Sequence, residues 1–174
     1  MSDDLIFNPK TNEGKYLTFN LLEEQYGISV YDIMQIIAIP NIIKIPQTPH
    51  YVKGVINLRG KIIPVMDLRL RFSLPEQEYD DKTSIIVISL HTISSLQNTF
   101  QEDQETFVGI IVDKVLEVID IHANDIESKP TFGVELDTDF ILAMAKVKNI
   151  VVTLLDMGKI LTSRELEHIQ KMKI

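Results

Sequence analysis

The sequence predicts a mostly β fold made of two similar five-stranded barrels that pack on each other. Ten short runs rich in isoleucine and valine have strand length, and Gly, Pro, Asn or Asp separates many of them. An internal repeat relates most of the runs in the first half to runs in the second. A single module of this kind, roughly 65 to 80 residues long, buries too little surface to be stable alone, so we expect the two to share a hydrophobic seam.

The predicted strands have similar composition, with β-branched residues dominating each. They are 16–21, 27–30, 42–45, 52–58, 61–66, 84–90, 107–112, 115–121, 140–147 and 150–155.

The first part of the repeat aligns GISVYDIMQIIAI (27–39) with GIIVDKVLEVIDI (109–121), at an offset of 82 residues. The second aligns VINLRGKIIPVMDL (55–68) with MAKVKNIVVTLLDM (144–157), at an offset of 89 residues. The latter places the dipeptide Arg59-Gly60 on Lys148-Asn149. Glycine and asparagine adopt the left-handed backbone of a tight hairpin most readily, so the same two-residue hairpin is predicted twice.

The repeat suggests one domain, 1–174, with a first barrel at 15–80 and a second at 81–160. Helices are expected to be minor. Thr48-Pro49 is typical of a short helix start, and residues 31–37 have the spacing of one helical turn. Thr162 to Glu165 fits a capping box, which predicts a C-terminal helix at 161–174.

Composition restricts the partners. The net charge of -8 disfavours long nucleic-acid tracts, since phosphate binding needs a basic surface. The start of the chain lacks the charge and apolar run of a secretory signal, and no apolar stretch is long enough for a membrane span. We therefore expect a cytoplasmic protein whose partners are proteins. The polar segment 91–106 is expected to be a mobile loop.

Catalytic and metal-binding patterns are missing from the sequence. Without cysteine there is no thiolate nucleophile or ligand, and the four histidines are scattered without metal-ligand spacing. No glycine-rich phosphate loop or GxSxG motif occurs. Asp67 and Asp156, at equivalent ends of the repeated hairpins, are explained by closing the turn after each strand. We expect neither an enzyme nor a cofactor.

Arg59 admits two interpretations. A hairpin tip can simply hold a charge in water, where it stabilises little. Alternatively, a guanidinium on a rigid hairpin can bind a partner's carboxylate or carbonyl oxygens with both arms, and arginine is enriched at interface hot spots. The basic counterpart Lys148 in an acidic chain supports the second interpretation.

Several stretches resemble the CheW family of bacterial chemotaxis adaptors. They are LTFNLLEEQYGISVYDI, PHYVKGVINLRGKIIPVMDLR, TSIIVISL, FVGIIVDKVLEV and LLDMGKIL, which together span roughly 16–161. The resemblance implies two five-stranded SH3-like barrels and no catalysis. It also implies two protein partners, namely the cytoplasmic tip of methyl-accepting chemotaxis receptors and the regulatory domain of the histidine kinase CheA, in arrays at the membrane without direct insertion.

Carried onto this chain, the resemblance implies a receptor-binding groove near the junction of the barrels, and a kinase contact on the first barrel. The receptor-binding residues would be Arg59, Ile33, Gln35, Ile36, Val115 and Val118. The kinase-binding residues would be Lys53, Gly54 and Ile62. Ile33 and Ile36 are the repeat equivalents of Val115 and Val118, so the groove would present similar aliphatic walls to an amphipathic helix.

Two alternatives remain at this point. One is a CheW-like module of another signalling scaffold. The other is a paired β-barrel that binds a small ligand or nucleic acid, although such a protein would need aromatic stacking surfaces among basic residues, and aromatics are only 7% of this acidic chain.

Overall fold

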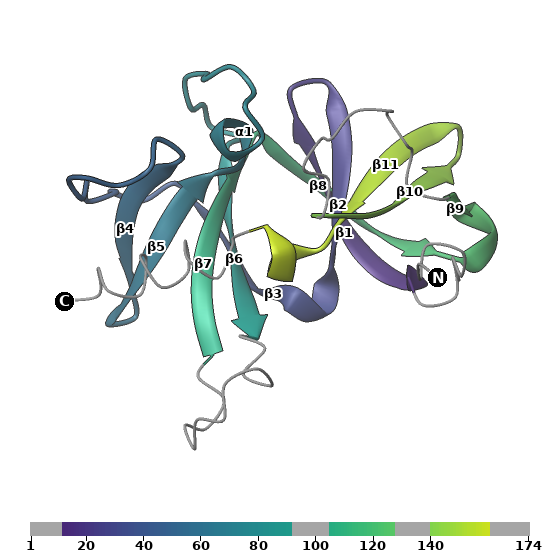
Figure 1. Ribbon diagram of the computed structural model, residues 1–174, viewed down its shortest axis with the longest axis horizontal. Coiled ribbons are helices and arrows are strands. Elements are labelled where there is room, and N and C mark those ends of the chain that lie inside the picture. Colours follow the sequence, from purple (N-terminus) through teal and green to yellow (C-terminus); the bar gives the residue numbers. More distant parts are fainter. Residues whose placement is uncertain (1–11, 92–104, 128–139, 161–174) are drawn as a thin grey trace, which may run out of the picture.

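The structure, a computed structural model, describes residues 12–91, 105–127 and 140–160, which form two sheets lying side by side along the long axis (Figure 1). The six-stranded sheet has the spatial order β8 (Lys114–Ile121), β1 (Gly14–Leu21), β2 (Glu24–Ser29), β11 (Ile150–Leu155), β10 (Ile141–Val147), β9 (Ile126–Glu127). The five-stranded sheet has the order β3 (Ile33–Ala38), β6 (Ser84–His91), β7 (Glu105–Val112), β5 (Lys61–Asp67), β4 (Val52–Leu58).

The predicted β fold is confirmed, and all but one of the predicted runs fall within strands, except for at most one residue at an end. The exception is 42–45, where only an isolated bridge joins Ile43 to Val55. The predicted C-terminal helix 161–174 and positions 92–104 of the predicted loop lie outside the described residues. Both ends of that loop lie in strands, because His91 is opposite Glu105 in the last pair of the β6–β7 ladder.

The two sheets have the same topology once the sequence repeat is applied. The repeat makes β3, β4 and β5 equivalent to β8, β10 and β11, while β1–β2 corresponds to β6–β7. Under this correspondence the order β8-β1-β2-β11-β10 becomes β3-β6-β7-β5-β4. Each sheet also contains one parallel pair at the same place, β2 with β11 and β7 with β5. The predicted duplication is therefore present in the fold.

The division at residue 80 does not match the distribution of strands between the sheets. Strands β1 and β2 of the first half belong to the sheet of the second half, and β6 and β7 of the second half belong to the sheet of the first. Each repeat thus contributes its first strand pair, β1–β2 or β6–β7, to the sheet formed by the rest of the other repeat. The reason is that β3 and β8 each pair with a strand from the other repeat, β6 and β1 respectively. Alignment of repeats reports equivalence, and cannot report which copy a strand pairs with.

The repeated hairpin turn is confirmed. Arg59 and Gly60 have φ of 52° and 84°, and Lys148 and Asn149 have φ of 51° and 65°. Positive φ at both central residues is the geometry of the type I′ turn, whose twist matches that of the flanking strands. The β4–β5 and β10–β11 hairpins therefore close in the same way.

The predicted helical turns need correction. A 3-10 turn, η3 (Val30–Asp32), is present, but the residues after it form strand β3 with alternating burial. Thr48 and Pro49 precede a turn and then β4, without a helix. Instead short helical segments follow the repeated hairpins, α1 (Leu68–Arg71) and η6 (Met157–Lys159). Asp67 and Asp156 cap them by accepting from the N–H groups of Arg69 and Gly158, as expected of turn-closing carboxylates.

A central cluster of apolar side chains joins the sheets. It includes Phe19 and Ile28 from the six-stranded sheet and Ile86 and Ile110 from the five-stranded sheet, all fully buried. Two smaller clusters fill the individual barrels. Because the central cluster contains side chains of both sheets, unfolding one sheet would expose apolar side chains of the other to water.

Gly54 provides a test of the fold. Its φ is +142°, and a Cβ atom there would lie 2.0 Å from the backbone oxygen of Ile43. We predict that Gly54→Ala lowers the free energy of unfolding by about 2 kcal/mol more than Gly14→Ala does, measured by denaturant titration. Gly14 is a matched control, because its φ is +148° and nothing lies near the added Cβ. Equal losses in the two variants would contradict the close approach of 42–45 to β4.

Candidate partner-binding surfaces

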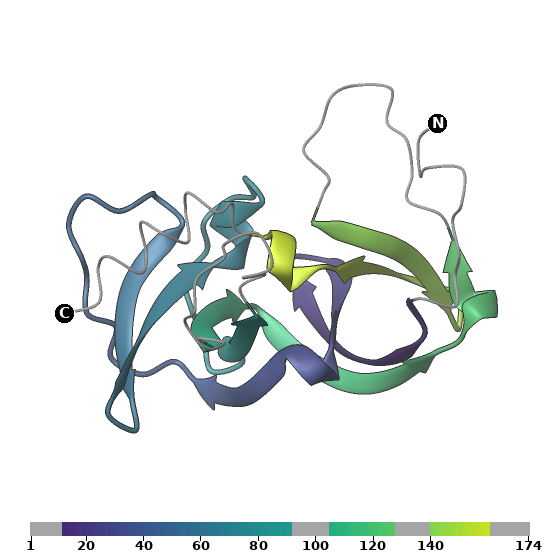
Figure 2. The same ribbon diagram turned by 60° about the horizontal axis from the view of Figure 1, so that its bottom comes forward.

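The β4–β5 turn presents Arg59 to solvent at the tip of a rigid hairpin. The side chain of Asn57 fastens the turn by accepting from the Gly60 N–H at 3.0 Å. Directly after the turn, the Lys61 ammonium lies 4.9 Å from the centre of the Phe107 ring. In both views the turn lies at the end of the five-stranded sheet away from the six-stranded sheet (Figure 2). Arg59 is exposed, as both of its interpretations require.

The four predicted aliphatic groove residues divide into an inner and an outer pair. Ile33 and Val115 are half-buried, and both pack against the central cluster. Ile36 and Val118 are exposed, at 43% and 53%. They lie on β3 and β8, which are the end strands of their sheets. Gln35 is half-buried and pairs with Val87.

The sequence missed two further apolar side chains beside this surface. Met34 is 46% exposed and Tyr31 is 87% exposed. Reading 31–37 as a helical turn concealed them. The signal was the alternation that begins at Ile33, since a strand places Met34 and Ile36 on the same outward face. No described contact joins Arg59 to these residues, so their use by one partner remains a prediction.

The predicted kinase-binding residues lie on the β4–β5 hairpin. Lys53 is half-buried, and its ammonium lies 2.5 Å from Glu76 Oε1, in the segment that leads from α1 to β6. Gly54 is buried at a β-bulge, where it lets 42–45 approach β4. Ile62 is half-buried, whereas its repeat equivalent Val151 is 51% exposed. Lys53 and Gly54 therefore both have structural roles within the chain.

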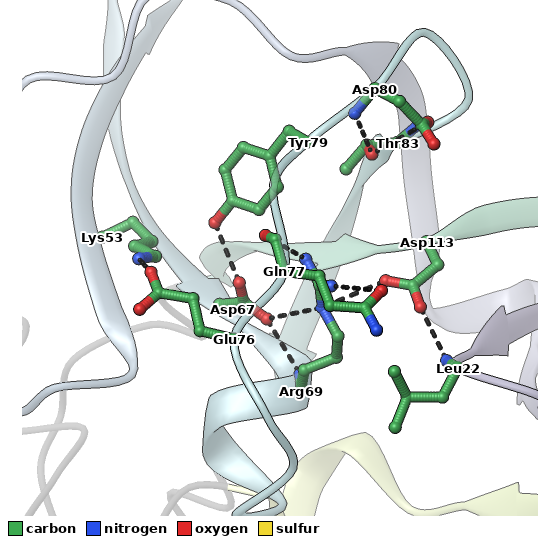
Figure 3. A network of polar contacts seen from close by, with 10 residues as sticks. All are labelled: Leu22, Lys53, Asp67, Arg69, Glu76, Gln77, Tyr79, Asp80, Thr83 and Asp113. Atoms are coloured by element: carbon green, nitrogen blue, oxygen red, sulfur yellow. Dashed lines mark hydrogen bonds and ion pairs between the residues drawn. The ribbon is translucent and has the colours of Figure 1, made fainter.

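A buried polar cluster that sequence reasoning missed lies between the sheets (Figure 3). Arg69, on α1, is only 1% exposed. Its Nε lies 3.1 Å from Asp113 Oδ1 and 3.7 Å from Asp67 Oδ1 as ion pairs, without a well-directed hydrogen bond at Nε. Its terminal nitrogens donate to the side chain and the backbone oxygen of Gln77. A buried cation with two carboxylates is stable only because each group has partners.

Both carboxylates of this cluster bind other groups as well. Asp67 accepts a 2.9 Å hydrogen bond from the Tyr79 hydroxyl, and burial together with the Asp67 charge raises the pKa of Tyr79. The second carboxylate, Asp113, lies in the link between β7 and β8 and accepts from the Leu22 N–H at 2.6 Å. The only sequence signal was a charge inside the DLRLR stretch, which composition alone assigns to the surface.

Among residues 12–91, 105–127 and 140–160, no helix has the length and apolar character that a membrane span requires. Within those same ranges no group of His, Asp and Glu side chains could hold a metal ion.

The chain therefore has two SH3-like barrels, exposed aliphatic residues on the end strands β3 and β8, and an exposed arginine at a hairpin turn. The crystal structure of the scaffolding protein TtCheW from Thermoanaerobacter tengcongensis matches this chain with a TM-score of 0.71 and 34% sequence identity, over 85% of this chain and 92% of that one. The sequence profile of the CheW-like domain matches residues 15–165. The chain belongs to the CheW-like family.

Curated relatives agree with this assignment. A chemotaxis protein CheW of Bacillus subtilis is 37% identical over 153 residues, which cover 87% of this chain and 88% of the relative. A chemotaxis protein CheW of Klebsiella aerogenes is 32% identical over 152 residues, which cover 87% and 84%. Family and fold together identify an adaptor of chemotaxis signalling, and the predicted family and fold are confirmed.

The inner and outer groove positions should respond differently to truncation. We predict that Ile36→Ala changes the free energy of unfolding by no more than about 0.5 kcal/mol, because Ile36 is already 43% exposed and packs on no buried cluster of the described residues. Ile33→Ala should cost about 2 kcal/mol, because Ile33 packs on the central cluster. Urea titration of both variants provides the measurement. If Ile36→Ala proved the more damaging variant, β3 would have to be turned over relative to this structure.

Proposed function

We propose that this chain is a non-catalytic coupling adaptor of the cytoplasm that joins the signalling tips of chemotaxis receptors to the histidine kinase CheA. The observation that carries the proposal is the pseudo-symmetric pair of end strands, β3 and β8, each with an exposed aliphatic residue outside a half-buried one. Aliphatic faces of this kind fit the apolar stripe of an amphipathic helix. The receptor tip would bind there.

Arg59 would add a polar contact to the apolar contact with the receptor. It is exposed, and the backbone that carries it is fixed by the type I′ turn and by the Asn57 contact to Gly60. A guanidinium presented in this way loses little freedom on binding a carboxylate or carbonyl oxygen. The half-buried Gln35 would contribute at the margin of the apolar surface.

The regulatory domain of CheA would bind the first barrel through the β4–β5 hairpin, around Lys53, Gly54 and Ile62. Strand β4 is an end strand of its sheet, and the Ile62 side chain is half exposed. Because Lys53 is paired with Glu76, a partner would engage it by competing for that ion pair. In a receptor array, many modest contacts of both kinds would add through avidity.

The receptor contact is tested by Arg59→Ala. We expect the variant to weaken binding to a dimeric coiled-coil peptide that carries a receptor tip by at least about tenfold, as loss of an interface arginine does. Binding to the CheA regulatory domain should fall less, because Lys53 and Gly54 lie toward the opposite end of the β4–β5 hairpin from the Arg59 turn. Isothermal titration with each partner separately gives both affinities.

Lys148→Ala is the matched control. Lys148 occupies the equivalent turn of the other hairpin with a φ of 51°, close to the 52° of Arg59, so both substitutions remove a cation from the same backbone geometry. It should leave receptor binding unchanged. Equal effects of the two substitutions would mean that overall charge, rather than the position of Arg59, governs binding.

A further inference from the structure

The chain crosses between the sheets at two equivalent places, and at one of them an ion pair reaches α1. The chain passes from β2 to β3 through Tyr31, and from β7 to β8 through Asp113. These two residues are equivalent at the offset of 82, and one is 87% exposed whereas the other pairs with buried Arg69. At the offset of 89 the equivalent of Arg69 is Gly158, which has no side chain to form a second such pair.

The pairs at Asp113 connect three parts of the chain at one crossing. Arg69 follows β5, in the five-stranded sheet, and its ion pair reaches the residue directly before β8, in the six-stranded sheet. Asp113 in turn accepts from the Leu22 N–H in the β1–β2 link, and its own N–H donates to the Asn20 carbonyl at 3.1 Å. The start of β8 is thereby tied to both sheets.

We propose that Arg69 is a positioning residue for the partner surface: through Asp113 it fixes β8, with Val115 and Val118, relative to β3, with Ile33 and Ile36. This inference rests on the proposed function for its biological meaning. Arg69 is buried and touches no partner itself. A rigid ion pair with hydrogen bonds at both ends sets the separation of the two walls, and a partner helix that contacts both walls gains affinity from that fixed separation.

A second contact at the junction limits the freedom of α1. Arg71 Nε donates to the Ile160 carbonyl at 2.9 Å, and these residues are equivalent at the offset of 89. A residue that bonds to its own repeat equivalent lies near the pseudo-two-fold axis that relates the sheets. Arg69 therefore acts from a short helix that is itself anchored close to this axis.

The test compares Asp113→Asn with Asp120→Asn. Both replace a carboxylate by an amide of the same shape, and Asp120 is an exposed β8 residue paired with Lys15 at 3.1 Å. Since the chain has no cysteine, Ile36→Cys and Val118→Cys allow a spin label on each wall without removing native thiols. We expect one narrow distance distribution in the parent and in Asp120→Asn, and a broadened one in Asp113→Asn.

Binding of the receptor-tip peptide, measured without the labels, gives the functional readout. Asp113→Asn should weaken it by about tenfold while Asp120→Asn stays within about twofold, and binding of the CheA regulatory domain should be unchanged in both. Arg69→Lys, which keeps the charge but loses the fork, should fall between the parent and Asp113→Asn. An unchanged distance distribution in Asp113→Asn would overturn the proposal.

Two other outcomes also bear on the proposal. If Asp113→Asn and Arg69→Lys both lose a cooperative thermal transition, Arg69 is a determinant of folding and not of position, and the proposal is wrong. If the parent protein fails to bind the receptor-tip peptide, the proposed function fails, while the label distances still decide whether Arg69 positions β8.

Discussion

The exchange of hairpins between the two repeats is the constraint on which the rest of this structure depends. Neither repeat completes a sheet alone, because β3 needs β6 and β8 needs β1. Burial of the central cluster then requires both sheets at once. The large apolar contribution to folding therefore belongs to the pair of barrels, and not to either barrel separately.

This arrangement explains where the exposed aliphatic residues lie. A strand that ends a sheet has one side without a neighbouring strand, and proteins usually protect such strands with charge or cover them. Here β3 and β8 instead expose Met34, Ile36 and Val118. Exposed apolar groups on two equivalent end strands are a surface suited to a helical partner. The duplication thus produced two similar end strands, β3 and β8. Each contributes a residue, Ile33 or Val115, that packs on the central cluster.

Sequence patterning predicted much of the fold and part of the site. Strand positions followed from β-branched runs, and the repeated turns followed from Gly60 and Asn149, because both features are local. Pairing between the repeats depends on contacts far apart in the chain, so the exchange was invisible. Arg69 was missed for a related reason: its burial depends on Asp113 and Gln77, and no local pattern distinguishes it from the exposed Arg59.

Native-state hydrogen exchange tests the interdependence of the sheets most directly. If the exchanged hairpins make one cooperative unit, the slow amides of β2 and β7, such as those of Ile28 and Ile110, should exchange through a common opening with equal free energies. A difference of more than about 1 kcal/mol between the two sets, with one sheet opening while the other stays protected, would contradict the account.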